Sequence, residues 1–219
     1  MKRLFTINFA LFFCLLLSVK CYGQDNFTTP PHTLSFHQIS KEWKNYVFFL
    51  PAGTEKHDIF TFFIALTEAY PNEVFFRALD KHLNFDTNGW LSHYVLDIPN
   101  GYMACSAASE LSPGFEMCCW KKTNGDHLYA VSFIGYRYLD ESEMTGNRRD
   151  ESISDLLFFE LKKGERRFVP IAPETVLGQT YDFKKYRVRL PRHGKDIKLM
   201  DENNTRLLKT LKWERNSFK

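Results

Sequence analysis

Residues 114–134, GFEMCCWKKTNGDHLYAVSFI, decide the class of fold. Two apolar runs, Phe115–Lys121 and Leu128–Ile134, flank the dipeptide Asn124-Gly125, which is the strongest short-range indication of a β-hairpin. Both faces of the first run are largely apolar, as in a strand covered on both sides. The stretch therefore predicts two antiparallel strands near the centre of a sheet.

A two-residue turn at Asn124-Gly125 places Trp120 opposite Tyr129 and Cys119 opposite Ala130. Because side chains alternate along a strand, Cys119 shares a face with the large apolar residues of its run. Its neighbour Cys118 shares the other face with a carboxylate. We expect Cys119 on the more deeply buried face, and Cys118 either partly exposed or covered by a loop. The two faces carry Phe115, Met117 and Cys119, and Glu116, Cys118 and Trp120.

Outward from this hairpin, short apolar segments alternate with turn residues. Leu91–Ile98 and Tyr102–Ala107 flank Pro99-Asn100-Gly101, which predicts a second hairpin. Leu156–Leu161 and Phe168–Ile171 predict a third. Shorter segments follow near Val188, Ile197 and Leu207, with Asn203-Asn204 as the last turn.

The chain before residue 85 has helical periodicity instead. Apolar residues recur every three or four positions in Thr54–Tyr70, and Pro71 ends that pattern. Asn72 is a suitable cap for a helix over Glu73 to about Leu83. A shorter helix is predicted from Ser35 through Trp43. The fold class is therefore α+β, with N-terminal helices packed on an antiparallel β-meander or sandwich of about eight short strands.

The first 23 residues predict a secretory signal peptide. Lys2 and Arg3 precede the apolar run Leu4–Val19, and cleavage is expected after Gly23. A lipoprotein modified at Cys21 and an uncleaved anchor remain alternatives. Export to the periplasm or beyond leaves one globular domain over residues 24–219, helical at about 35–85 and β-rich at about 90–219.

Removal of the leader changes the charge of the chain. The full sequence has 29 Lys and Arg against 26 Asp and Glu. Lys2, Arg3 and Lys20 leave with the leader, so the remaining chain has no formal net charge. Such a chain lacks an overall electrostatic preference for nucleic acid or anionic lipid. We expect no nucleic-acid partner and no membrane-spanning segment after cleavage, and we interpret the basic clusters 162–167 and 184–189 as solvated faces.

Three cysteines, Cys105, Cys118 and Cys119, remain after cleavage. Either all three are free thiols, or one disulfide joins Cys105 to one of the adjacent pair. If a disulfide forms, Cys118 is the expected partner, because it is the more accessible thiol. A bridge between neighbours is strained. Three cysteines and scattered histidines do not form a zinc-binding pattern. We therefore expect no metal and no cofactor.

Established catalytic motifs are absent from the sequence, including those of P-loop enzymes, Ser hydrolases and zinc proteases. A hydrolase would need a site assembled from dispersed residues, for which Cys118, His93 and Asp97 are the candidates. His127 lies too far along the hairpin to act as base for Cys118. For ligand binding, Trp120 and Trp90 are the candidates, because an exposed indole can stack on a sugar ring.

Several turn and strand motifs carry a resemblance over roughly residues 90–219. They are Asp97-Ile-Pro-Asn-Gly-Tyr102, Cys119-Trp120 before Asn124-Gly125, Leu157-Phe-Phe159, Leu190-Pro191, Gly194-Lys-Asp-Ile197 and Leu211-Lys-Trp213 to Phe218. In these the chain resembles exported β-rich proteins of unknown function from Gram-negative bacteria. The resemblance implies a secreted β-rich module and transfers no site residue.

Two functional hypotheses follow. The favoured one is a non-catalytic binding or interaction module of the bacterial envelope, whose partner is an envelope protein or a glycan. The alternative is a secreted hydrolase with the dispersed site. A histidine or cysteine within hydrogen-bond reach of a carboxylate in a pocket would favour the hydrolase.

Overall fold

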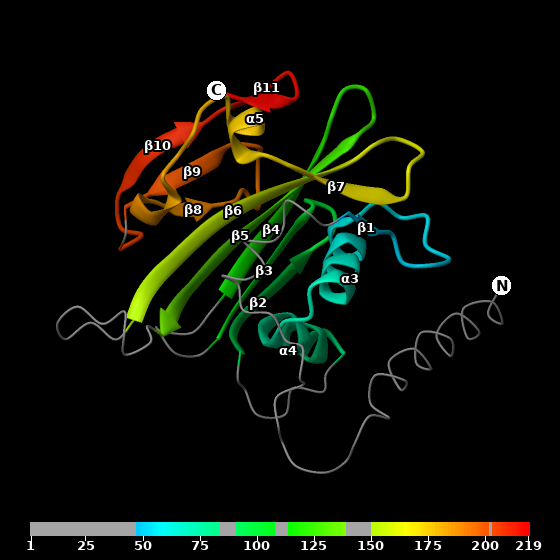
Figure 1. Cartoon of the computed structure of the whole chain (residues 1–219), viewed down its shortest axis with the longest axis horizontal. Coiled ribbons are helices and arrows are strands. Elements are labelled where there is room, and N and C mark those ends of the chain that lie inside the picture. The colour runs from blue at the N-terminus through cyan, green and yellow to red at the C-terminus, as the bar shows by residue number, and fades with distance from the viewer. Residues whose placement is uncertain (1–46, 84–90, 108–113, 139–149, 202) are drawn as a thin grey trace, which may run out of the picture. The chain divides into compact units, whose positions relative to one another are not determined.

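Seven antiparallel strands form the main sheet, in the spatial order β1-β7-β6-β5-β4-β3-β2 (Figure 1). Strands β2 to β7 are neighbours in the order in which they occur along the chain, so the predicted meander is confirmed. The strands are β1 (Phe48–Phe49), β2 (Leu91–Asp97), β3 (Tyr102–Ala107), β4 (Gly114–Lys121), β5 (His127–Tyr138), β6 (Asp150–Leu161) and β7 (Arg167–Ile171).

This computed structural model describes residues 47–83, 91–107, 114–138, 150–201 and 203–219. All of them belong to one unit of the chain, residues 33–219. The expected signal peptide, the expected helix from Ser35 to Trp43, and Trp90 lie outside the described residues.

The central hairpin forms where it was predicted, but its register differs by one residue. Trp120 pairs with Leu128 and Cys119 with Tyr129. The loop has three residues: the amide of Gly125 donates to the carbonyl of Lys122 at 3.0 Å, and the φ of Gly125 is +92°. A type I turn followed by a left-handed glycine is the usual three-residue hairpin loop. A shift of one residue exchanges the two faces of β5, so Tyr129 lies on the face of Cys119.

Two helices precede β2, as predicted. α3 (Ile59–Ala69) begins at Asp58, whose carboxylate accepts a hydrogen bond from the amide of Thr61 at 2.8 Å. α4 (Glu73–His82) begins at Asn72, whose side-chain oxygen accepts from the amide of Val74 at 2.9 Å. These side chains satisfy amides that the first helical turn leaves without a partner.

Aromatic rings join these helices to one face of the main sheet. Phe62 of α3 stacks on Tyr129 at 4.5 Å between ring centroids. Phe75 of α4 meets Phe115 edge-on at 5.2 Å. Such offset and edge-to-face pairs are the favoured geometries for aromatic side chains, and they make this face a dry core.

The other face is covered by the chain's last 37 residues, 183–219, which we name the C-terminal layer. A short helix, α5 (Pro173–Leu177), leads into it, and Figure 1 shows it in orange to red on the side away from α3 and α4. A three-stranded sheet, ordered β10-β9-β8, and a two-stranded hairpin compose it. Its elements are η3 (Phe183–Lys185), β8 (Arg187–Arg189), β9 (Ile197–Met200), β10 (Leu207–Leu211), β11 (Trp213–Glu214) and β12 (Ser217–Phe218).

The hairpin of β11 and β12 turns at Arg215 and Asn216, whose φ angles are +47° and +79°. Two consecutive positive φ values define a type I′ turn. The predicted turn at Asn203-Asn204 lies between β9 and β10, as expected. The later turn at Arg215 and Asn216 was not predicted.

The protein is mostly antiparallel β-sheet with few helices, which confirms the predicted strand arrangement in outline. The expected number and length of the strands are wrong. Twelve strands occur among the described residues instead of about eight, and β5 and β6 have 12 residues each. The short segments of the C-terminal layer account for most of the difference.

Candidate functional site

Three alternate residues of β4 bind the segment that leads from β8 to β9. We name Glu116, Cys118 and Trp120 the β4 anchor row. They lie on one face because side chains alternate along a strand, and this is the face covered by the C-terminal layer. All three are at least 94% buried, with 6%, 3% and 2% of their surface exposed, respectively.

Each anchor makes a hydrogen bond to the segment 189–195. The two carboxylate oxygens of Glu116 accept from the guanidinium of Arg189 at 2.6 Å and from the amide of Leu190 at 2.7 Å. The thiol of Cys118 donates to the carbonyl of Pro191 at 3.4 Å. The indole of Trp120 donates to the carbonyl of Lys195 at 2.9 Å. The row therefore fixes the C-terminal layer to the main sheet.

Asp97, at the end of β2, also binds the segment that leads from β8 to β9. Its carboxylate accepts from Nε of Arg192 at 2.9 Å and from the side chain of Asn100 at 3.0 Å. These hydrogen bonds, that of Arg192 first, lower the pKa of Asp97. Asp97 pairs with Tyr102, which pairs with Cys118 on the next strand. Two strand spacings separate Asp97 from Cys118, about 10 Å, so the two are not in hydrogen-bond reach.

His93, the third candidate for a dispersed hydrolase site, is exposed on β2, the edge strand of the main sheet. It lies four residues from Asp97, which corresponds to about 13 Å along a strand. The structure therefore does not bring Cys118, His93 and Asp97 together.

The two adjacent cysteines differ in part from the expectation. Cys119 does share the face of Phe115, as predicted, but it is the partly exposed member, and Cys118 is buried. Of the two alternatives for Cys118, partial exposure is wrong and cover by a loop is confirmed, because Pro191 in the connection from β8 to β9 lies against its thiol. Burial raises the pKa of both thiols, that of Cys119 to about 12. Neither has the low pKa of a cysteine nucleophile.

No disulfide joins the three described cysteines. Cys105 pairs with Phe115, whereas Cys118 pairs with Tyr102. Paired residues share a face, so Cys105 and Cys118 point to opposite sides of the sheet. Cys119 shares the side of Cys105 but lies four residues beyond Phe115, about 13 Å away along β4. A disulfide requires Cα atoms within about 7 Å, which excludes a bridge from Cys105 to Cys119, and the opposite orientation of Cys118 excludes one from Cys105 to Cys118. Of the two alternatives, the one without a bridge is confirmed.

Trp120 is unsuited to stacking on a ligand. Its ring stacks on Trp213 at 5.7 Å and meets Phe218 edge-on at 5.3 Å. With 2% of its surface exposed, it presents no free face to a sugar. Trp90, the other residue considered for ligand binding, lies outside the described residues.

Two histidine rings, one of them just before the first turn of α3, lie in contact. The rings of His57 and His127 meet edge-on, with centroids 5.6 Å apart. The hydroxyl of Tyr129 donates to the carbonyl of His57 at 2.9 Å. Burial, followed by the charges of His57 and Lys121, lowers the pKa of His127. Nδ1 of His127 has no hydrogen-bond partner among the described residues. His127 pairs with Lys121, three residues from Cys118, so it is remote from that thiol, as predicted.

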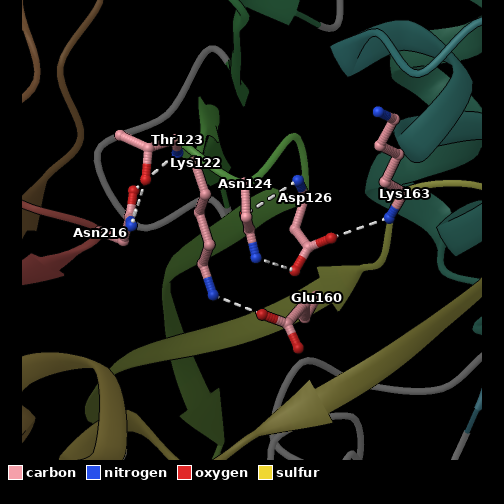
Figure 2. Close-up of polar contacts among 7 residues, drawn as sticks. All are labelled: Lys122, Thr123, Asn124, Asp126, Glu160, Lys163 and Asn216. Atoms are coloured by element: carbon pink, nitrogen blue, oxygen red, sulfur yellow. Dashed lines mark hydrogen bonds and ion pairs between the residues drawn. The ribbon is translucent and has the colours of Figure 1, made fainter.

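Three turns meet at one end of the main sheet, in a group of polar residues that we name the turn cluster (Figure 2). It comprises Lys122, Thr123, Asn124, Asp126, Glu160, Lys163 and Asn216. Asn216, from the β11–β12 turn, accepts from the amide of Thr123 at 2.9 Å and donates to the hydroxyl of the same residue at 2.8 Å. These two bonds fasten the C-terminal hairpin to the central hairpin.

Asp126 joins the central hairpin to the turn between β6 and β7. Its carboxylate accepts from the amide of Lys163 at 2.9 Å and from the side chain of Asn124 at 2.7 Å. Both bonds lower the pKa of Asp126, with the amide of Lys163 contributing most. Lys122 forms an ion pair with Glu160. No local sequence pattern indicates this cluster, because its partners are separated by as many as 93 residues along the chain.

Across the described parts of the chain, no group of three or more His, Cys, Asp or Glu side chains could hold a metal ion. The same residues include no helix of the length and apolar character needed to cross a membrane.

Comparisons with known proteins assign no relative to this chain. Searches of protein-family models, curated proteins and solved structures produced no match.

Proposed function

We propose that the protein is an exported, non-catalytic interaction module of the bacterial envelope. The observation that carries the proposal is the bonding of the polar side chains on β4 and β2. Cys118 and Glu116 are buried and bound to the backbone of residues 190–191. Asp97 is bound to Arg192. Groups engaged in this way support a structural role.

We class the architecture as α+β, with the helices before residue 85 packed on an antiparallel sheet. In this arrangement the sheet is the rigid support and its ends are the places where a partner can bind. The turn cluster supplies such an end. Its exposed residues, among them Thr123 and Asn124, are fixed by hydrogen bonds before any partner arrives. Preorganisation of this kind reduces the entropic cost of association.

A protein partner is the better supported of the two expected classes. Glycan recognition commonly uses an exposed aromatic ring, and the described tryptophan considered for it, Trp120, is buried. The turn cluster instead offers amide, carboxylate and backbone groups to a polypeptide surface.

The first test addresses catalysis. The native protein is treated with a cysteine-directed electrophile at pH 8 and analysed by peptide mass spectrometry. We expect no modification of Cys118 in the folded chain and complete modification after unfolding in urea. Rapid labelling of Cys118 in the native state would contradict the proposal and favour the hydrolase.

The second test addresses location and partner. A photo-crosslinking amino acid is placed at Asn124 in the full chain, and at Glu68, exposed on α3, as the matched control. Cells are fractionated and the mass of the chain is measured. We expect an exported chain without residues 1–23 and a discrete crosslinked product from position 124 alone. An unprocessed cytoplasmic chain, or equal crosslinking from both positions, would refute the proposal.

A further inference from the structure

The charges of the expected mature chain are separated between its two parts. The C-terminal layer, residues 183–219, contains 12 Lys and Arg and four Asp and Glu. Residues 24–182 contain 14 Lys and Arg and 22 Asp and Glu. The formal charges are therefore +8 and −8, and the neutral total conceals a strongly basic layer. Charge asymmetry of this size indicates a surface for an anionic partner.

Three of these basic residues, Arg187, Arg189 and Lys198, lie on the outward side of the three-stranded sheet. The inward side consists of Val188, Ile197, Leu199 and Leu211, all buried in the core. Residues of opposite parity face outward, and the register places them in two cross-strand rows. One row is Arg187, Met200 and Leu207, and the other is Arg189, Lys198 and Thr210. Neither row contains an acidic residue.

Two large apolar side chains lie beside these charges. Leu207 and Leu208 on β10 are 49% and 42% exposed, and they occupy an edge strand of the small sheet. Arg206 and Lys209 flank them in the sequence, and both are exposed. The ammonium group of Lys209 lies 5.2 Å from the ring centre of Tyr181, so an aromatic ring supports that charge from one side.

Asp201 is a described acidic residue beside this face, and its hydrogen bonds lower its pKa, so it carries one negative charge. Both oxygens of Asp201 accept hydrogen bonds within its own turn, from Thr205 and from the amide of Arg206. Glu202 lies outside the described residues. Arg189 is already bound to Glu116 and to the side chain of Asn204, so it positions the sheet and does not supply a charge for a partner. Lys209 pairs with Leu199 and therefore belongs to the inward row. Lys198 and Arg206 remain as charges for a partner.

We propose that the outward face of β8, β9 and β10 docks on an anionic lipid bilayer. Leu207 and Leu208 enter the boundary between headgroups and acyl chains, and Lys198 and Arg206 contact lipid phosphates. Exposed apolar side chains surrounded by basic ones are the combination that binds the surface of such a membrane. A soluble polyanion would use the charges and leave the leucines without a role.

The test is co-sedimentation of the protein with vesicles of phosphatidylcholine alone and with vesicles containing one-quarter phosphatidylglycerol. We expect binding to the anionic vesicles, weakened by salt. Because residues 4–19 could themselves enter a bilayer if retained, the readout is the difference between variants of the same chain. K198Q/R206Q should weaken binding about fivefold for each charge removed. L207S/L208S, with no change of charge, should weaken it about tenfold.

K56Q/K121Q is the matched control. It removes two exposed basic side chains outside the C-terminal layer and should change binding by less than about twofold, because screening confines their effect to about 10 Å. All substituted side chains are exposed, and an unchanged urea midpoint verifies folding.

Failure to bind anionic vesicles better than neutral ones would overturn the proposal. So would undiminished vesicle binding by L207S/L208S together with tight binding to dextran sulfate, which would identify a soluble polyanion as the partner. The proposal does not depend on the interaction module proposed above, because vesicle binding is measured without any protein partner or exported cell fraction.

Discussion

Replacement of Arg189 tests whether the β4 anchor row fixes the C-terminal layer. The side chain of Glu116 is 8% exposed, whereas that of Arg189 is 44% exposed. Arg189→Gln therefore leaves a buried carboxylate without its counter-ion, while Glu116→Gln leaves a guanidinium that water can solvate. The two substitutions remove the same ion pair, but we expect them to have different costs.

The magnitudes follow from burial. Loss of one partner of a fully buried ion pair costs about 3–5 kcal/mol. The Leu190 amide still donates to Glu116 in the variant, and solvent reaches Arg189, so we expect about 2–3 kcal/mol for R189Q. E116Q keeps an acceptor for that amide and should cost about 1–2 kcal/mol. The double variant should cost no more than E116Q, because the buried charge is gone.

Urea unfolding of the three variants measures these free energies. R189Q should lower the midpoint by about 1 M at an unchanged slope. R167Q is the matched control, because Arg167 pairs with Glu165 at 2.8 Å with side chains 55% and 34% exposed. Its cost should not exceed about 0.5 kcal/mol. The reasoning is refuted if R189Q is as stable as R167Q, or if the double variant loses the sum of the two single losses.

Three further predictions concern thiols, pH and the turn cluster. The thiol of Cys119 should react with a disulfide reagent at pH 8 about a thousandfold more slowly than an unfolded thiol, because its pKa is raised to about 12; equal rates in both states would contradict this. Burial lowers the pKa of His127 below 6.5 in the folded chain. As the pH falls below 6.5, this histidine therefore takes up a proton in the unfolded chain before it does so in the folded chain. Stability should therefore decrease there, and H127Q should flatten this slope of the free energy of unfolding below pH 6.5; an unchanged slope would exclude His127 as its source. N216G keeps the positive φ and loses both hydrogen bonds to Thr123, so it should cost about 1 kcal/mol. N216A should cost about 1 kcal/mol more than N216G, because alanine is strained at a positive φ. Equal urea midpoints for the two variants would show that strain does not contribute.

The sequence located the central hairpin but not its register. Asn124-Gly125 fits two loops that differ by one residue: a type I′ turn, or a type I turn with glycine in the next position. The choice depends on contacts outside the hairpin. Asp126 accepts from the amide of Lys163, and Thr123 binds Asn216. Both partners come from other hairpins, so no local pattern in residues 114–134 could have identified the loop.

The burial of Cys118 could not be decided from the sequence for a related reason. Glu116 was interpreted as a sign of exposure or of cover by a loop, because an isolated buried carboxylate is costly. In the structure that cost is offset by Arg189 and the amide of Leu190, more than 70 residues later in the chain. Local alternation correctly divided β4 into two faces. It could not show that a second layer covers the face with the carboxylate.

Charge is subject to the same limitation. The neutral total of residues 24–219 argues against an anionic partner only if positive and negative charges are mixed over the surface. The antiparallel sheet separates them instead, since its covered face receives the basic residues 183–219 as one layer. A domain of this kind is neutral in bulk solution, but within a Debye length of about 10 Å an approaching surface meets only one of its two parts. The orientation of binding is then set by the three-stranded sheet, whose outward side is basic because its inward side, with Val188, Ile197 and Leu199, is required by the core.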